Sequence, residues 1–185
     1  MFHLVSCFNE KHKLKLDQNQ QLTDSYMEKK SRIEMCVIML RVLIGWHFLY
    51  EGIVKLYNPD WTAFGYLASA QGPLKSVFTM LANESIIGWV DTLNMAALLL
   101  VGFTLLLGVF EKFGAFVGIG LLTMYYLAHP PFPGLTQLNV EGNYWLVNKN
   151  LIEMVALLLL FYFPTGHLFG IKSLRKQKLV SNEMD

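Results

Sequence analysis

The chain has 185 residues, of which 54% are hydrophobic and 16% are charged, and its formal net charge is +1. This charged fraction lies below the roughly 25% of soluble globular proteins, and the near-neutral balance excludes the concentrated basic surface that nucleic-acid binding requires. Cys7 and Cys36 are far apart and form no CxxC pair, so they predict no disulfide framework and no zinc or iron–sulfur ligand set. The composition favours a membrane protein in which any redox chemistry depends on another group.

Residues 1–31 are polar, with mixed charges and little apolar periodicity, and are predicted to form a mobile cytoplasmic tail. The apolar run that follows is long and has no A-x-A-like cleavage site, so a signal peptide is not expected. Met27 begins the sequence MEKKSRIEM and would make a natural start just before the first predicted span.

The fold class that we predict is an all-α membrane protein, a bundle of four transmembrane helices within residues 32–171. A bilayer core of about 30 Å needs roughly 20 apolar residues in a helix. Stretches that approach or meet this length are 34–56, 87–110, 113–128 and 146–163. Residues 57–85 between the first two spans are aromatic and apolar, which predicts an interfacial helical segment, broken into two pieces at Pro73. After the third span, Pro130, Pro131 and Pro133 predict a rigid turn.

Lysine and arginine residues predict the orientation, because cytoplasmic loops carry an excess of them. The loop 57–86 contains Lys75 alone, and the loop 129–148 contains neither type. The basic residues of the tails are Lys11, Lys13, Lys15, Lys29, Lys30 and Arg32 before the bundle and Lys172, Arg175, Lys176 and Lys178 in the C-terminal tail, residues 172–185. Both termini are therefore predicted to be cytoplasmic, with the bundle in the bacterial inner membrane and both long loops outside.

Polar side chains lie within three of the predicted spans, where an ionisable group costs roughly 2.5–3.5 kcal/mol at the helix centre and needs a partner or water. They are Arg41, His47, Glu51 and Lys55 in the first span, Asp91 and Asn94 in the second, and Asn150 and Glu153 in the fourth. At 100° per residue His47, Glu51 and Lys55 follow one stripe of a helix. The orientation brings most of these groups to a similar depth in the outer half, with Arg41 deeper, where only an internal acid would satisfy it.

Two interpretations of these residues remain open. In one they pair with one another, Arg41 with Glu153 or Asp91, and merely hold the bundle together. In the other they form a polar pocket that opens to the outer side. Lys55 and Lys149 are expected to extend to the membrane interface.

A membrane quinone is the ligand that we expect in such a pocket, because its carbonyls need hydrogen-bond donors with a proton-exchanging group nearby. The candidate catalytic residues are Glu51, Asp91 and Glu153, and the candidate cofactor-binding residues are Arg41, His47, Asn94 and Asn150. The expected apolar walls are Phe48, Tyr125 and Tyr126. A lipid head group or a small anion would use the same residues. No metal or haem is predicted, because no paired-histidine pattern crosses the core.

Several segments resemble the DoxX/DoxD family of integral membrane proteins. They are RVLIGWHFLYEGIVKL, NPDWTAFGYLASAQGP, VGFTLLLGVFEKFGAF and EGNYWLVNKNLIEMVALLLL, and the resemblance runs from about Arg32 to Arg175. The residues at the family's pattern positions are Arg41, Gly45, Gly52, Lys55, Asn150 and Glu153. The resemblance implies a four-helix membrane protein but transfers no agreed catalytic residues.

The DoxD branch of this family is the membrane subunit of thiosulfate:quinone oxidoreductase, which oxidises thiosulfate to tetrathionate and reduces quinone. The resemblance therefore implies a membrane subunit of a quinone-linked oxidoreductase that works with a partner redox subunit. The alternatives are a non-catalytic scaffold or lipid-binding protein that recruits a soluble redox partner and, less favoured, a small-solute carrier. The motif Gly114-x-x-x-Gly118 leaves a homodimer open.

Overall fold

The computed structural model describes residues 2–132 and 143–171 and, within them, the side chains of residues 19–132 and 145–171. The described chain is mostly helical, and its first helix, α1, spans Phe2–Tyr57. The chain divides into two compact units, residues 1–37 and residues 38–185.

The first unit consists of the N-terminal part of α1. Residues 2–31, predicted as a mobile tail, are therefore helical. Ion pairs one helical turn apart join Glu28 to Arg32 and Lys30 to Glu34. Each such pair adds about 0.2–0.5 kcal/mol to helix stability, and the segment carries no apolar periodicity, so the hydrophobic pattern gave no indication of it.

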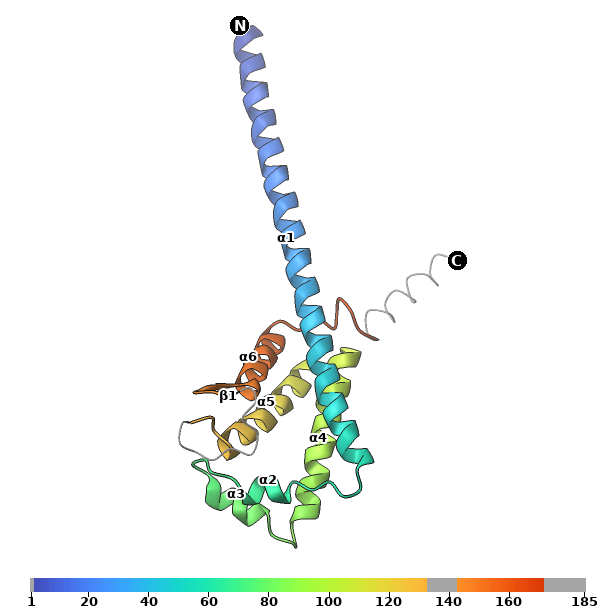
Figure 1. Ribbon diagram of the computed structural model, residues 1–185. Helices are drawn as coiled ribbons and strands as arrows, with labels where there is room; N and C mark the ends of the chain where they lie inside the picture. Colours follow the sequence, from blue (N-terminus) through green and yellow to red (C-terminus); the bar gives the residue numbers. More distant parts are fainter. Residues whose placement is uncertain (1, 133–142, 172–185) are drawn as a thin grey trace, which may run out of the picture. The chain divides into compact units, whose positions relative to one another are not determined.

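The second unit contains the rest of α1 and five further helices. They are α2 (Phe64–Ala68), α3 (Lys75–Leu81), α4 (Ile87–Leu107), α5 (Glu111–Ala128) and α6 (Lys149–Tyr162). α5 packs against both α4 and α6 (Figure 1). The interfacial segment predicted as two pieces is two short helices, α2 and α3, separated around Gly72 and Pro73.

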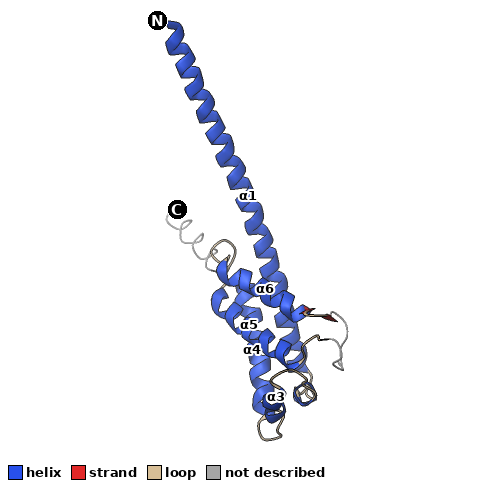
Figure 2. Cartoon of the chain, turned by 90° about the vertical axis from the view of Figure 1, so that its left-hand side faces the viewer, coloured by secondary structure: helices blue, strands red, loops and turns tan. Residues whose placement is uncertain are grey.

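Local backbone features explain where the later helices depart from the predicted bounds. α4 ends at Leu107, before the predicted Phe110, because Gly108 adopts a left-handed conformation with φ of 65°. α6 begins at Lys149, after the predicted Leu146, because the Asn148 side chain caps it by accepting a hydrogen bond of 3.0 Å from the Leu151 amide. Residues 143–148 form a small antiparallel hairpin, with β1 (Asn143–Tyr144) paired to β2 (Val147–Asn148) (Figure 2).

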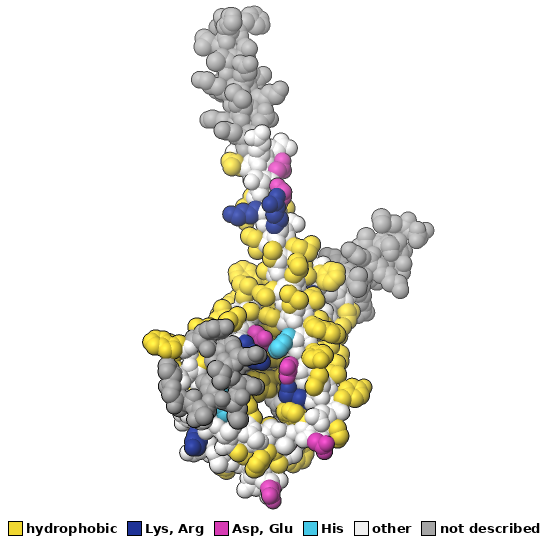
Figure 3. Space-filling model, in the orientation of Figure 1, with side chains coloured by type: hydrophobic (Ala, Val, Ile, Leu, Met, Phe, Trp, Pro, Cys, Tyr) yellow, Lys and Arg dark blue, Asp and Glu magenta, His cyan; other side chains and the backbone are white. Residues whose placement is uncertain are grey.

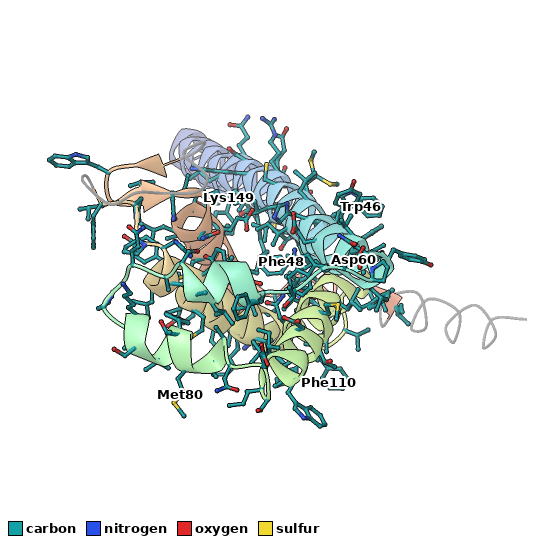
Figure 4. The ribbon with its side chains drawn as sticks, turned by 60° about the horizontal axis from the view of Figure 1, so that its bottom comes forward. Trp46, Phe48, Asp60, Met80, Phe110 and Lys149 are labelled. Carbon is teal, nitrogen blue, oxygen red and sulfur yellow. The ribbon has the colours of Figure 1, made fainter. Side chains whose placement is uncertain are left out.

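Four helices close around one apolar core. Its most buried members are Phe48 on α1, Val101 and Leu105 on α4, Ala115 on α5, and Leu157 and Leu160 on α6. Phe48 lies in the middle of the helices, whereas Trp46 and Phe110 lie at the periphery (Figure 4). A smaller cluster packs α2 and α3 onto the end of α5 through Leu67, Ala70, Phe78, Ala82 and Ala128.

Glycines let these helices approach closely. A Cβ on Gly102 of α4 would lie 2.6 Å from the Leu49 nitrogen of α1. A Cβ on Gly114 would lie 1.9 Å from Thr104 Oγ1, and one on Gly118 would lie 2.8 Å from a Leu157 methyl carbon. The two glycines of Gly114-x-x-x-Gly118 are therefore used in contacts within the chain, with α4 and α6.

Large apolar side chains cover much of the outside of these helices (Figure 3). Examples on three helices are Trp46, Trp89 and Phe116, with exposed fractions of 58%, 73% and 67%. Two helical stretches, Asn19–Tyr57 and Ile87–Leu107, are long and apolar enough to cross a membrane. An apolar outer surface of this extent marks contact with lipid or with other protein.

Candidate functional site

The candidate site is a polar cluster formed by five residues of α1 and α6, which are His47, Glu51, Lys55, Lys149 and Glu153. His47 Nε2 lies 3.4 Å from Glu153 Oε1, which joins the two helices. Lys55 Nζ forms an ion pair with the Glu51 carboxylate one turn earlier. The predicted stripe of His47, Glu51 and Lys55 thus faces α6 and meets Glu153 there.

Lys55 is held on three sides. Besides the ion pair, its Nζ lies 3.4 Å from the Glu51 carbonyl oxygen and 5.6 Å from the centroid of the Trp61 ring. The exposed fraction of its side chain is 17%. A cation over an indole face is attracted by the ring quadrupole, so Trp61 helps to place the charge beside Glu51.

The polar cluster is open to its surroundings. The side chains of His47 and Glu51 are 42% and 41% exposed, and that of Glu153 is 22% exposed. Acidic, basic and histidine side chains gather around a hollow on the face shown in Figure 3. Lys149 lies at the first turn of α6 (Figure 4). It interacts electrostatically with both Glu51 and Glu153. With a neutral imidazole the cluster is balanced, with two carboxylates and two ammonium groups.

Asp91 and Asn94 make their contacts away from the His47–Glu153 pair. Asp91 Oδ1 accepts a hydrogen bond of 2.8 Å from the Ala63 amide just before α2. Asn94 Oδ1 accepts a hydrogen bond from the Tyr125 hydroxyl, and Tyr125 interacts electrostatically with Glu51. Asn94 is therefore linked to the polar cluster through Tyr125. Asn150 lies half-buried on the first turn of α6.

Tyr66 and His129 tie α2 to the end of α5. The Tyr66 hydroxyl donates to the Tyr125 carbonyl oxygen at 3.1 Å, and His129 Nε2 lies 2.8 Å from the Tyr66 carbonyl oxygen. The two rings lie 4.3 Å apart between centroids. Desolvation raises the pKa of Tyr66 to about 12. α5 ends at Ala128, with His129 as its C-cap.

Arg41 belongs to a second, separate group, the arginine cluster of Arg41, Glu111 and Thr165. Arg41 Nη1 donates to Glu111 Oε1 and to Thr165 Oγ1, both at 3.1 Å, and Nη2 donates to the Phe169 carbonyl oxygen. Glu111 Oε2 accepts from the Thr165 amide at 2.9 Å. All three residues of the cluster are buried.

The prediction that Arg41 pairs with Glu153 or Asp91 is therefore wrong. The physical reason is position along the helix, because α1 rises about 9 Å between Arg41 and His47 at roughly 1.5 Å per residue. Arg41 thus lies level with the α4–α5 turn and the C-terminal segment, where Glu111 supplies the internal acid. Glu111 and Thr165 were missed as site residues. The predicted orientation contained a signal for them, because it places the start of the first predicted span and the turn between the second and third predicted spans at the same membrane face.

The polar cluster can donate hydrogen bonds and exchange protons beside an apolar wall. His47 and Lys149 carry N–H donors, Glu51 and Glu153 accept, and the buried ring of Phe48 adjoins His47 in the chain, with ring centroids 6.1 Å apart. Such a mixed set suits a flat organic molecule with polar edges better than a bare ion. Among the described residues, no group of three or more His, Cys, Asp or Glu side chains has an arrangement that would hold a metal ion. Comparisons with protein-family models, with curated proteins and with solved structures found no match to this chain.

Proposed function

We propose that this chain is a four-helix protein of the bacterial inner membrane that binds a quinone at the polar cluster and serves as the membrane subunit of a quinone-linked oxidoreductase. The observation that carries the proposal is the open ion-paired cluster between α1 and α6, within an otherwise apolar helical surface. Groups of this kind are expensive in a membrane and are retained there for function. The resemblance to the DoxX/DoxD family supports the same assignment, with thiosulfate as the first electron donor to test.

The membrane placement rests on the apolar outer surface and on the positions of charged residues. α1 and α4 have the length and composition of spans, and in this proposal α5, which packs against α4, and α6, which packs against α5, are the third and fourth. With 14 residues, α6 rises only about 21 Å at ~1.5 Å per residue. In this proposal, the hairpin β1–β2 before α6 and residues 163–171 after it cover the remaining thickness of the membrane. α2 and α3 lie at the outer interface in this arrangement, and both basic tails are cytoplasmic.

The residues of the polar cluster fit a quinone head group. The His47 imidazole and the Lys149 ammonium group supply donors for carbonyl oxygens, and Phe48 supplies an apolar surface. Bound quinone would accept electrons from a partner redox subunit and protons from its surroundings. Within the chain, His47 Nε2 lies 3.4 Å from Glu153 Oε1, and Lys55 pairs with a second carboxylate, that of Glu51, nearby.

The test is the quinone content of protein purified gently from native-like membranes and measured by mass spectrometry. We expect near-stoichiometric quinone in the wild type and a loss in Glu153→Gln and in His47→Ala. Glu84→Gln is the matched control, because Glu84 is an exposed carboxylate in the turn before α4 and lies outside the polar cluster. Quinone at the lipid background in the wild type, or unchanged retention in both cluster variants, would refute the proposed site.

The second candidate function is a non-catalytic scaffold or lipid-binding protein that recruits a soluble redox partner. The observation in its favour is the helical N-terminal part of α1, whose residues 19–34 are almost all exposed and carry two ion pairs on the helix surface. A scaffold would copurify with a partner and retain no quinone. Deletion of residues 2–26 would then remove the partner, whereas the quinone-binding function predicts that quinone retention survives this deletion.

A further inference from the structure

We propose that the polar cluster is a blind pocket, closed toward the cytoplasmic end of the bundle, so that ligand and protons reach it from the outer half alone. This inference deepens the proposed function and rests on the membrane placement given there. It concerns the access route of the site, and it is argued from the order of polar and apolar residues along the two helices that form the cluster.

The inward-facing stripe of α6 changes from polar to apolar within one turn. Glu153 pairs with His47 and is partly exposed, whereas Leu157 and Leu160, four and seven residues later on the same face, are completely buried. On α1, which runs in the opposite direction, the apolar residues come before the polar ones along the chain. Ile44, one turn before His47, is buried at 7% exposure, and Phe48, next to His47, is buried at 1% exposure. The face directly below the His47–Glu153 pair is therefore apolar on both helices.

Ile44, Leu157 and Leu160 form an apolar plug together with Val101 and Leu105 of α4, which are both 0% exposed. The helices approach one another closely in this layer. A Cβ on Gly45 of α1 would lie 3.0 Å from Leu105 Cβ, and one on Gly118 of α5 would lie 3.3 Å from a Val101 methyl carbon. A close-packed layer of this kind excludes water and charged solutes because it holds no polar partner for them.

Below the plug, the arginine cluster ties the ends of the elements together. Arg41 binds Glu111 at the start of α5 and Thr165 and Phe169 in the segment after α6. A Cβ on Gly166 would lie 2.0 Å from Glu111 Oε1, so this segment lies directly against the buried carboxylate. The cytoplasmic end is thus fastened by a buried ion pair, whereas the polar cluster above remains partly exposed.

The test is the side from which single cysteines can be labelled. The full chain is reconstituted in oriented vesicles with Cys7→Ser and Cys36→Ser, and Glu51→Cys and Glu153→Cys are introduced separately. Glu84→Cys and Lys29→Cys mark the outer and cytoplasmic sides. A membrane-impermeant maleimide is applied to one side at a time, and the labelled fraction is measured by mass spectrometry. Two cluster positions are used so that a variant that fails to fold does not decide the result.

We expect the cluster cysteines to be labelled when the maleimide is applied from the Glu84 side and to remain unlabelled when it is applied from the Lys29 side. Label from the Lys29 side, from both sides or from neither side would overturn the blind pocket. If the two reference cysteines are labelled from the same side, the membrane placement itself is wrong. This readout uses no quinone, so the access route and quinone binding can fail independently of one another.

Discussion

Arg41 and Glu111 are 70 residues apart in the chain, yet Arg41 Nη1 lies 3.1 Å from Glu111 Oε1 with both side chains buried. The Arg41 side chain is 0% exposed, and its Nε has no hydrogen-bond partner among the described residues. In the part of the chain that the structure describes, Glu111, Thr165 and the Phe169 carbonyl oxygen compensate the guanidinium. This ion pair connects α1 to α5, and the hydrogen bonds of Arg41 to Thr165 and Phe169 add the segment after α6 at the same end of the bundle.

Glu111→Gln is expected to destabilise the protein strongly, because it leaves the Arg41 charge buried without a counter-charge. Breaking one partner of a buried pair costs about 3–5 kcal/mol of the free energy of unfolding. The measurement is unfolding in mixed micelles at increasing SDS. The double variant Arg41→Met with Glu111→Leu removes both charges and should be more stable than Glu111→Gln. Equal stability of Glu111→Gln and the exposed-site control Glu84→Gln would argue against the pair.

Gly102→Ala is expected to force α1 and α4 apart, because the new Cβ would lie within 2.7 Å of three atoms of Leu49, two of them backbone. Overpacking of this kind costs about 1–3 kcal/mol. Gly120→Ala on α5 is the matched control, because a Cβ there would have no neighbour within 4 Å. That change should be neutral or raise stability by about 0.5–1 kcal/mol through helix propensity. Thermal unfolding midpoints in detergent would compare the two, and similar midpoints would contradict the close contact.

Asp91→Asn and Asp91→Leu separate a structural from a proton-exchanging role of Asp91. The asparagine retains an oxygen for the Ala63 amide, which now donates to Asp91 Oδ1 at 2.8 Å. The leucine removes that acceptor, and losing a hydrogen bond to a charged group costs about 1.5–3 kcal/mol. We expect Asp91→Asn to match the wild type in both stability and quinone retention. Loss of quinone in Asp91→Asn without loss of stability would instead assign Asp91 to the ligand site.

Tyr66 is expected to make the fold sensitive to alkaline pH. Its pKa is raised to about 12, whereas an unfolded tyrosine ionises near 10. The folded state therefore keeps a proton that the unfolded state loses, so this contribution is complete below about pH 10 and declines as the pH rises toward 12. A spectrophotometric titration of phenolate absorbance would show a late-ionising component, and Tyr66→Phe should reduce it by one tyrosine. An unchanged titration curve in this variant would contradict the assignment.

The sequence by itself located the helices of the second unit to within a few residues. Hydropathy, the proline-rich turn and Pro73 are local features, and they predicted a helix ending near Leu56, two short helices after it and a helix ending at Ala128. These local features mispredicted the ends of helices where a cap determines the end. Gly108 stopped α4 early, and Asn148 started α6 late, because a cap depends on backbone conformation that hydropathy does not describe. The helical N-terminal segment was missed because its sequence carries no apolar stripe.

Part of the candidate site was also contained in the sequence, because helical spacing alone places His47, Glu51 and Lys55 on one stripe. The tertiary structure decided which side chains meet this stripe. Glu153 and Lys149 lie beside it, whereas Asp91 accepts a hydrogen bond from the Ala63 amide and Arg41 pairs with Glu111. Pairing between helices depends on their relative height and rotation, which small residues such as Gly45 and Gly102 set through close backbone contact. Those contacts join residues dozens of positions apart, so no local pattern of hydropathy or charge specifies them.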